Sequence, residues 1–125
     1  KLSYIGFNAK GHQVRDVLHI EHVCKIISIQ IKKFKKINNM TFNVGGGINN
    51  LISLKNLTIK CEKLTKNKIQ IKKIYRTSNY DIPYFVTNNS KIKKIYKWKP
   101  VKNINNILKD IYFWLKKNKK VRKYF

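Results

Sequence analysis

Acidic residues and arginines are the scarcest charged groups in this chain of 125 residues. Five Asp and Glu side chains stand against 29 Lys and Arg, which gives a formal net charge of +24 at pH 7. Such a charge favours attraction to phosphate groups, in nucleic acid or at an anionic lipid surface. Arginine, whose planar fork reads phosphate and guanine in bidentate fashion, is nevertheless nearly absent. The low arginine content argues against a reader of nucleic-acid sequence.

Lysine, isoleucine and asparagine are abundant instead. Together they make up 60 residues, a bias expected from an AT-rich coding sequence whatever the function. We therefore interpret most of the charge as a solvated lysine surface. A basic nucleic-acid-binding module is the alternative, because lysines interleaved with exposed aromatic rings can hold a single strand.

Catalytic and metal-binding motifs are also lacking. The few carboxylates show no spacing that proposes a general acid and base pair, and no Gly-x-Ser-x-Gly motif occurs. His19, His22 and Cys24 lie close together, but a zinc site needs a fourth ligand that the spacing does not supply. The sequence thus predicts no catalytic residue and no metal ligand. Asp16 is expected only to orient or neutralise its neighbour Arg15.

Cysteine is rare, and long hydrophobic runs are missing. Cys24 and Cys61 lie far apart, which does not suggest a disulfide framework. Both fall on predicted apolar helix faces, so we expect buried, reduced thiols in a cytoplasmic protein. No apolar run approaches the roughly 18 residues that cross a bilayer, and no signal peptide is visible. No membrane partner is therefore expected.

Glycine is sparse, and its pattern excludes two nucleotide-binding loops. Gly6 and Gly11 have the spacing of half a P-loop, but His12 stands where that loop requires lysine. The glycine triplet at 45–47 lacks the G-x-G-x-x-G spacing of a dinucleotide site. We interpret the triplet as a strand-to-helix turn that needs permissive backbone angles.

Apolar residues make up 42% of the chain and are spread along it, so a folded domain is expected. No repeat and no linker rich in Pro, Gly or Ser divides it, which favours one α/β unit over residues 1–125. Strands are predicted at 13–19, 40–44 and 69–75, an extended segment at 82–87, and helices at 20–36, from Ser53 to about Leu64, at 89–96 and at 103–117.

Two helices carry clear apolar faces, and aromatic residues gather in the second half. Trp98 and Trp114 are expected in the core, while Tyr80 and Tyr84 are open to a binding role. The face of the first long helix comprises Val23, Ile26, Ile27, Ile31 and Phe34. That of the final helix comprises Ile104, Ile107, Leu108, Ile111, Trp114 and Leu115.

Six short motifs follow one another over almost the whole chain. They lie at 13–19 (QVRDVLH), 42–47 (FNVGGG) with Ser53-Leu54, 81–83 (DIP), 88–91 (NNSK), 97–100 (KWKP) and 107–114. In this order they resemble the extended short-chain dehydrogenase/reductase superfamily. More narrowly, the chain is similar to its NAD-dependent nucleotide-sugar epimerases and dehydratases, of the CDP-paratose/tyvelose 2-epimerase kind.

The resemblance implies that this is the carboxyl-terminal part of such an enzyme. In the family this part holds the last Rossmann strand and most of the small α/β domain that binds the nucleotide diphosphate. The family's NAD-binding loop and its Tyr-x-x-x-Lys catalytic pair have no counterpart in this chain. The resemblance therefore predicts a segment that binds a nucleotide-diphosphate sugar without catalysing on its own, within an NAD-dependent enzyme that can form a homodimer.

The resemblance also implies which residues bind the substrate. Arg15 matches the arginine that contacts the diphosphate, and Gln13 lies in the segment that lines the nucleotide-sugar pocket. The family's second phosphate arginine usually stands three residues before the Asp of the Asp-x-Pro motif. Here Asp81 is that aspartate and Ser78 occupies the arginine's place, so Arg76 is the candidate substitute. The loss at Ser78 motivates a third hypothesis, a non-catalytic remnant of the family.

Overall fold

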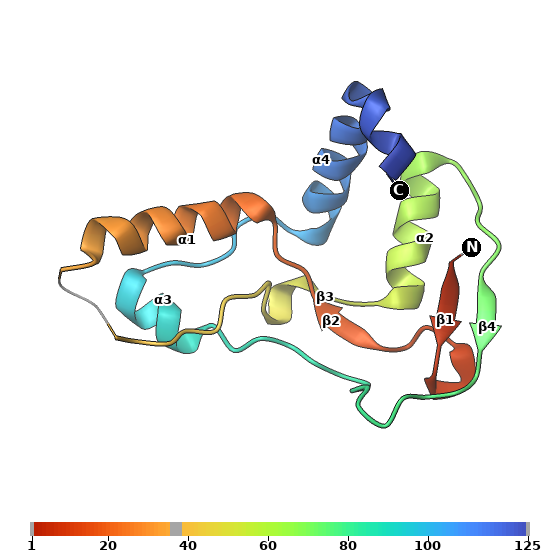
Figure 1. The fold of residues 1–125 in the computed structure, drawn as a ribbon, viewed down its shortest axis with the longest axis horizontal. Coiled ribbons are helices and arrows are strands. Elements are labelled where there is room, and N and C mark those ends of the chain that lie inside the picture. The colour runs from red at the N-terminus through yellow and green to blue at the C-terminus, as the bar shows by residue number, and fades with distance from the viewer. Residues whose placement is uncertain (1, 36–38, 125) are drawn as a thin grey trace.

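Four α-helices, two pairs of strands and three short 3-10 helices make up the regular structure of the computed structural model, which describes residues 2–35 and 39–124 (Figure 1). The helices are α1 (Ile20–Lys33), α2 (Leu54–Thr65), α3 (Ser90–Tyr96) and α4 (Ile104–Lys117). The strands are β1 (Ser3–Ile5), β2 (Val14–Asp16), β3 (Leu51–Ser53) and β4 (Lys72–Ile74).

The strands form two separate two-stranded sheets. β1 and β4 pair in parallel, and β2 and β3 pair in antiparallel fashion. The free edge of β2 is taken by the extended segment at 83–85, because Val14 N–H donates to the Pro83 carbonyl and Phe85 N–H donates to the Val14 carbonyl. β2 therefore lies between β3 and that segment, and the loop that ends at Asp81 is brought beside it.

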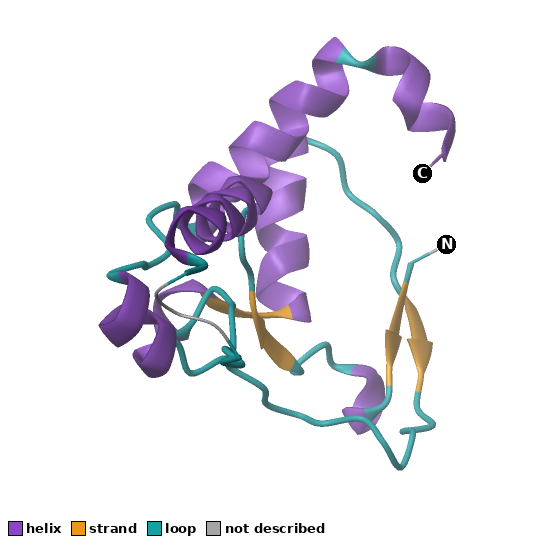
Figure 2. Ribbon diagram, turned by 60° about the vertical axis from the view of Figure 1, so that its left-hand side comes forward, coloured by secondary structure: helices purple, strands orange, loops and turns teal. Residues whose placement is uncertain are grey.

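Three of the helices begin at residues whose side chains accept a backbone N–H from the first turn. Ser53 Oγ accepts from Asn56 N–H, as the sequence predicts, and Asn103 Oδ1 accepts from Asn106 N–H. At α1 the acceptor is His19 Nδ1, which binds Glu21 N–H at 3.2 Å. These caps define where α1, α2 and α4 start. Figure 2 shows α2 and α4 side by side, with the β1 and β4 pair standing apart.

The core lies between α1 and α3. Ile26, Ile92, Tyr96 and Trp98 form one buried cluster, and the Phe42 ring meets the Tyr96 ring edge-on at 5.2 Å. The prediction for Trp98 is confirmed, since only 2% of it is exposed. The prediction for Trp114 is wrong, because 51% of it is exposed.

Helical periodicity marked the apolar faces correctly but overestimated how much of them is covered. In α1 the buried member of the predicted face is Ile26, whereas Ile27, Ile31 and Phe34 are exposed. Cys24 is exposed and Cys61 only half-buried, so the expectation of two buried thiols is wrong. Periodicity reports which side chains share a face, and a neighbouring element must still lie against that face to bury them.

The predicted strand at 40–44 does not form, and this segment has no regular structure. Side chains hold it instead: Phe42 packs on Tyr96, and Lys91 Nζ donates to the Thr41 carbonyl at 3.0 Å. A strand needs a neighbouring backbone for its ladder, and α3 offers side chains in that place.

The glycine triplet that follows is not a strand-to-helix turn, and only Gly47 has a left-handed backbone (φ 68°, ψ −171°). Gly45 and Gly46 are needed because the neighbouring segments leave no room for a Cβ atom at either position. A Cβ on Gly46 would lie 2.1 Å from the Val17 carbonyl oxygen, and one on Gly45 would lie 2.2 Å from Thr87 Oγ1. The triplet is thus a tight crossing of three segments.

None of the helices in the described ranges is long and apolar enough to cross a membrane.

Candidate functional site

β2 and the loop before the 83–85 segment bring three predicted binding residues together. Arg15 Nη2 forms an ion pair with Asp81 Oδ1 at 3.0 Å, and Gln13 Nε2 lies 3.5 Å from Asp81 Oδ2. Asp81 is 66 residues from Arg15 in sequence. The backbone bonds of Val14 to the 83–85 segment create this contact, because they align the loop with the strand.

The Arg15 guanidinium is held in place but still reaches solvent. Nη1 donates to the Val14 carbonyl at 2.8 Å and Nη2 donates to Asp81, while 40% of the side chain is exposed. A guanidinium has five N–H donors. These two bonds leave three of them for an anionic ligand. Such a group is oriented in advance, which is what bidentate binding of phosphate oxygens requires.

Gln13 supports this arrangement from inside the protein. Only 6% of the residue is exposed. Its Nε2 donates one hydrogen bond to the Ile5 carbonyl and a second, longer one to Asp81 Oδ2. Its Oε1 is buried and has no hydrogen-bond partner among the described residues. The amide thus links the end of β1 to the Asp81 loop and limits where that carboxylate can lie.

Asp16 does not pair with Arg15, contrary to the expectation from their adjacency. Successive side chains of a strand point to opposite faces. Asp16 Oδ2 accepts from Gly47 N–H at 2.7 Å, and its Oδ1 accepts from both the N–H and the hydroxyl of Thr87 at 3.2 Å. Asp16 therefore ties β2 to the glycine triplet and to the segment before α3.

Arg76 and Ser78 lie in the exposed loop that follows β4. Ser78 Oγ accepts from Tyr80 N–H at 3.3 Å, and Thr77 Oγ1 accepts from Phe7 N–H at 2.8 Å. Asp81 N–H donates to the Ser78 carbonyl at 3.1 Å, so Ser78 joins the pair through its backbone. Within the described residues, Arg76 makes no hydrogen bond or ion pair with Arg15 or Asp81. The structure thus gathers Gln13, Arg15 and Asp81, ties Ser78 to Asp81 through the backbone, and leaves the Arg76 side chain exposed.

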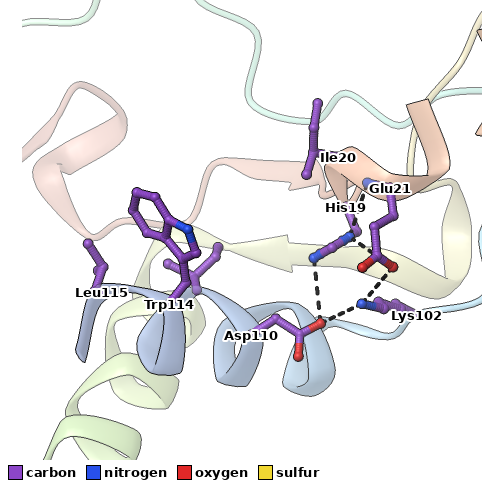
Figure 3. A pocket seen from close by; sticks show the side chains of 8 residues that line it. His19, Ile20, Glu21, Lys102, Asp110, Trp114 and Leu115 are labelled. Atoms are coloured by element: carbon purple, nitrogen blue, oxygen red, sulfur yellow. Dashed lines mark hydrogen bonds and ion pairs between the residues drawn. The ribbon is translucent and has the colours of Figure 1, made fainter. Parts of the chain in front are cut away.

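A hollow of about 750 Å³ lies between the start of α1 and α4 (Figure 3), and its lining includes none of Gln13, Arg15 and Asp81. One wall is apolar, with Ile20, Ile111 and Trp114, and the other carries a charged cluster. Lys102 Nζ lies 2.6 Å from Asp110 Oδ2 and 2.8 Å from Glu21 Oε2. No sequence motif signals this cluster, because Glu21 lies more than 80 residues before Lys102 and Asp110 and meets them only after folding.

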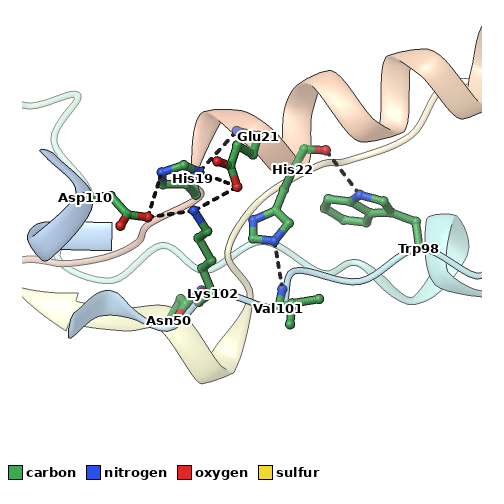
Figure 4. Close-up of polar contacts among 8 residues, drawn as sticks. All are labelled: His19, Glu21, His22, Asn50, Trp98, Val101, Lys102 and Asp110. Atoms are coloured by element: carbon green, nitrogen blue, oxygen red, sulfur yellow. Dashed lines mark hydrogen bonds and ion pairs between the residues drawn. The ribbon is translucent and has the colours of Figure 1, made fainter. Parts of the chain in front are cut away.

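Mutual neutralisation shifts the pKa values in this cluster (Figure 4). Hydrogen bonds from the Lys102 ammonium lower the pKa of the Glu21 and Asp110 carboxyls, and the bond to Asp110 above all raises the pKa of Lys102. His19 joins through Nε2, 3.5 Å from Asp110 Oδ2. The network fastens α4 to the start of α1.

His22 is a buried histidine with a structural role. Its Nε2 accepts from Val101 N–H at 3.1 Å, and its carbonyl accepts from Trp98 Nε1 at 3.2 Å. Burial lowers the pKa of His22, and the nearby positive charge of Lys102 lowers it further. A ring whose Nε2 accepts a hydrogen bond must be neutral there, so protonation would break the contact to Val101.

This geometry predicts that stability falls as the pH drops below about 6.5. The unfolded chain has the ordinary histidine pKa of 6.5 and the folded chain a lower one. The unfolded state therefore binds the proton first, and the contribution of neutral His22 is lost as the pH falls through the folded-state value. Urea unfolding of the parent and of His22→Gln between pH 7 and pH 5 measures this. The variant keeps an acceptor that does not titrate, so its curve should be flatter. If the free energy of unfolding changed equally with pH in the parent and in His22→Gln, the pH dependence would come from other groups.

Metal and dinucleotide chemistry find little support in these residues. No group of three His, Cys, Asp or Glu side chains in the described ranges is placed to hold a metal ion. Gly45 and Gly46 lie close to Thr87 and Val17, and the triplet lacks the G-x-G-x-x-G spacing of a dinucleotide site.

Comparison with solved structures identifies the architecture. A UDP-glucose 4-epimerase from Stenotrophomonas maltophila with bound NAD and formylated UDP-arabinopyranose matches 97% of this chain with a TM-score of 0.80 and 18% identity. A dTDP-glucose 4,6-dehydratase from Bacillus anthracis in complex with NAD matches 96% with a TM-score of 0.74 and 24% identity. Each match covers 36% of the solved chain. The chain therefore has a mixed α/β fold that corresponds to about a third of each of these solved chains.

Sequence comparison agrees on the narrower resemblance. The chain is 29% identical over 108 residues to CDP-paratose 2-epimerase of Salmonella typhi, which covers 86% of this chain and 31% of that enzyme. No family model matches. The chain spans about a third of the length of these three proteins.

Proposed function

We propose that this chain binds the diphosphate of a nucleotide sugar at Arg15, as one part of an NAD-dependent epimerase or dehydratase. The observation that carries the proposal is the oriented, partly exposed guanidinium of Arg15, held by Asp81 across 66 residues of sequence. A UDP-glucose 4-epimerase from Bifidobacterium longum in complex with NAD+ and UDP has the same fold over 94% of this chain, with a TM-score of 0.75 and 22% identity.

The chemistry of the site suits a diphosphate. The three N–H donors left on Arg15 can make charge-assisted bonds to phosphate oxygens, and these are stronger than bonds between neutral groups. Asp81 fixes the plane of the guanidinium, and buried Gln13 fixes Asp81. Gln13 thus acts as a positioning residue in this proposal. Arg76, in the exposed loop five residues before Asp81, supplies a second cation from the side of the loop.

The chemistry of epimerisation is assigned to residues outside this chain. NAD supplies hydride transfer where it is bound, and the glycine triplet of this chain does not fit that role because it lacks the G-x-G-x-x-G spacing of a dinucleotide site. This chain's own contribution is to bind and orient the nucleotide end of the substrate. We expect it to bind nucleotide sugars without turning them over.

Isothermal titration of the chain with UDP, CDP, dTDP and their sugars tests this function. Arg15→Ala should weaken binding by about 10- to 100-fold, because a hydrogen bond to a charged group contributes roughly 1.5–3 kcal/mol. Arg15→Lys keeps the charge but loses the planar fork, so it should restore only part of the affinity. Lys68→Ala removes one exposed positive charge elsewhere and should change nothing.

Two results would contradict the proposal. Equal affinity of the parent and Arg15→Ala would remove Arg15 from the site. Absence of binding by a chain that is folded by circular dichroism would favour the hypothesis of a remnant without ligand.

A further inference from the structure

Two adjoining hollows around α3 form a continuous basic groove. The first, of about 480 Å³, is lined by Ser90, Lys93, Lys94, Lys97 and Lys99. The second, of about 460 Å³, shares Ser90, Lys93 and Lys99 with the first and continues to the glycine triplet, the asparagines at 88–89 and Tyr84. We call the two together the α3 groove. It shares no residue with the site at Gln13, Arg15 and Asp81.

The four lysines of the α3 groove carry uncompensated charge. None of their side chains has an ion-pair or hydrogen-bond partner within the described part of the chain. All five carboxylates are engaged elsewhere. Asp16 binds the Gly47 and Thr87 backbone, Glu21 and Asp110 bind Lys102, Glu62 accepts from Ile69 N–H, and Asp81 pairs with Arg15. An anion entering the groove therefore meets four free ammonium groups and no competing acid.

The helix end does not account for this clustering. Lysines in the last turn complement the negative end of a helix dipole, which explains Lys93 and Lys94. Lys97 and Lys99 lie beyond the last residue of α3, yet they line the same hollow. The groove therefore gathers more positive charge than a capped helix requires, and four lysines suit several linked anionic groups better than one.

The aromatic residues decide how a ligand would be held. Tyr96 and Trp98 alternate with the lysines in sequence but are buried in the core, so no base can stack on them. Tyr84 differs, since 56% of it is exposed and it lines the far part of the groove. The groove thus offers point charges for phosphates and one ring for a base.

We propose that the α3 groove binds single-stranded nucleic acid through its phosphate backbone, with one base against Tyr84. Lysine ammonium groups contact phosphates without reading sequence, and stacking on an aromatic ring is tolerant of base identity. A single strand can enter a concave groove, whereas a flat anionic bilayer cannot. This binding is independent of the nucleotide-sugar site.

Fluorescence anisotropy with a labelled fifteen-residue oligothymidylate, over a range of salt concentrations, tests the proposal. A quadruple variant replaces Lys93, Lys94, Lys97 and Lys99 with glutamine. Each phosphate contact in a single strand contributes about 0.7 to the slope of log K against log salt, so the slope should fall by about 3. The matched control also carries four glutamines and so removes the same charge. They replace four lysines that are exposed and outside the groove: Lys55, Lys63, Lys68 and Lys109. Its slope should change by less than about 1.

A further variant and a competitor separate the nucleic acid from other phosphate chains. Tyr84→Ala should weaken oligothymidylate binding by about tenfold and leave binding of inorganic polyphosphate unchanged, since a stacked base contributes roughly 1–3 kcal/mol. Equal effects of the two quadruple variants would overturn the proposal, because binding would then follow net charge alone. The proposal would also be overturned if polyphosphate bound and Tyr84→Ala kept its full affinity for oligothymidylate. The groove would then bind a phosphate chain without using the bases.

Discussion

Replacing Trp98 with alanine should lower the free energy of unfolding by about 3–5 kcal/mol, as is usual when a large buried aromatic residue is removed from a core. Trp98 is 2% exposed, packs with Ile26, Ile92 and Tyr96, and donates from Nε1 to the His22 carbonyl. Its loss therefore opens a cavity between α1 and α3 and removes a hydrogen bond. Urea unfolding followed by far-ultraviolet circular dichroism measures the change.

Two other substitutions separate the parts of this effect. Trp98→Phe keeps most of the ring but loses the donor to His22, and should cost about 1–2 kcal/mol. Trp114→Ala removes the same side chain from a half-exposed position on α4 and should cost only about 1 kcal/mol. Equal losses at the two tryptophans would contradict the placement of the core between α1 and α3.

Replacing Gly46 with alanine should destabilise the chain by about 3 kcal/mol or more, at the upper end of what overpacking costs. The new Cβ would lie 2.1 Å from the Val17 carbonyl oxygen and 2.7 Å from its carbon. Both atoms belong to the backbone, so no side-chain rotation can relieve the clash. Val17 N–H also donates to the Asn50 carbonyl, so any shift would disturb the link between the end of β2 and the turn at 48–50.

Asn49→Ala is the matched control for this substitution, because it lies in the same turn with an exposed side chain. It should change stability by less than about 0.5 kcal/mol. The two variants are compared by the same unfolding measurement. If Gly46→Ala proved as stable as Asn49→Ala, the close crossing at the triplet would not exist in solution.

One carboxylate connects the strand of the proposed nucleotide-sugar site to the segment beside the α3 groove. Asp16 accepts hydrogen bonds from Gly47 and Thr87, and so joins β2, which carries Arg15, to the segment that leads into α3. Arg15 lies on the opposite face of the same strand. The two surfaces are thus placed relative to each other by one carboxylate, although they share no lining residue.

Local patterns in the sequence were sufficient to predict where the helices lie. The Ser53 cap, the short helix before Trp98 and the final helix from 103 to 117 all formed where predicted. These features depend on residues three or four apart, so their cause lies within a single segment. The choice of Arg15 and Asp81 as residues of interest came from the family resemblance, and the pair proves to be in contact.

Other features required the tertiary structure, because they depend on which segments meet. Sequence adjacency suggested Asp16 as the partner of Arg15, but strand alternation and the 83–85 segment made that partner Asp81. Periodicity placed Trp114 in the core, yet no described element covers that part of α4 enough to bury it. The amino-acid sequence alone thus determined the local elements, through short-range hydrogen bonds and capping. Long-range packing alone decided burial, the partner of each charge, and the positions of the Arg15–Asp81 pair and of the α3 groove, since contacts between distant segments leave no periodic signal in the chain.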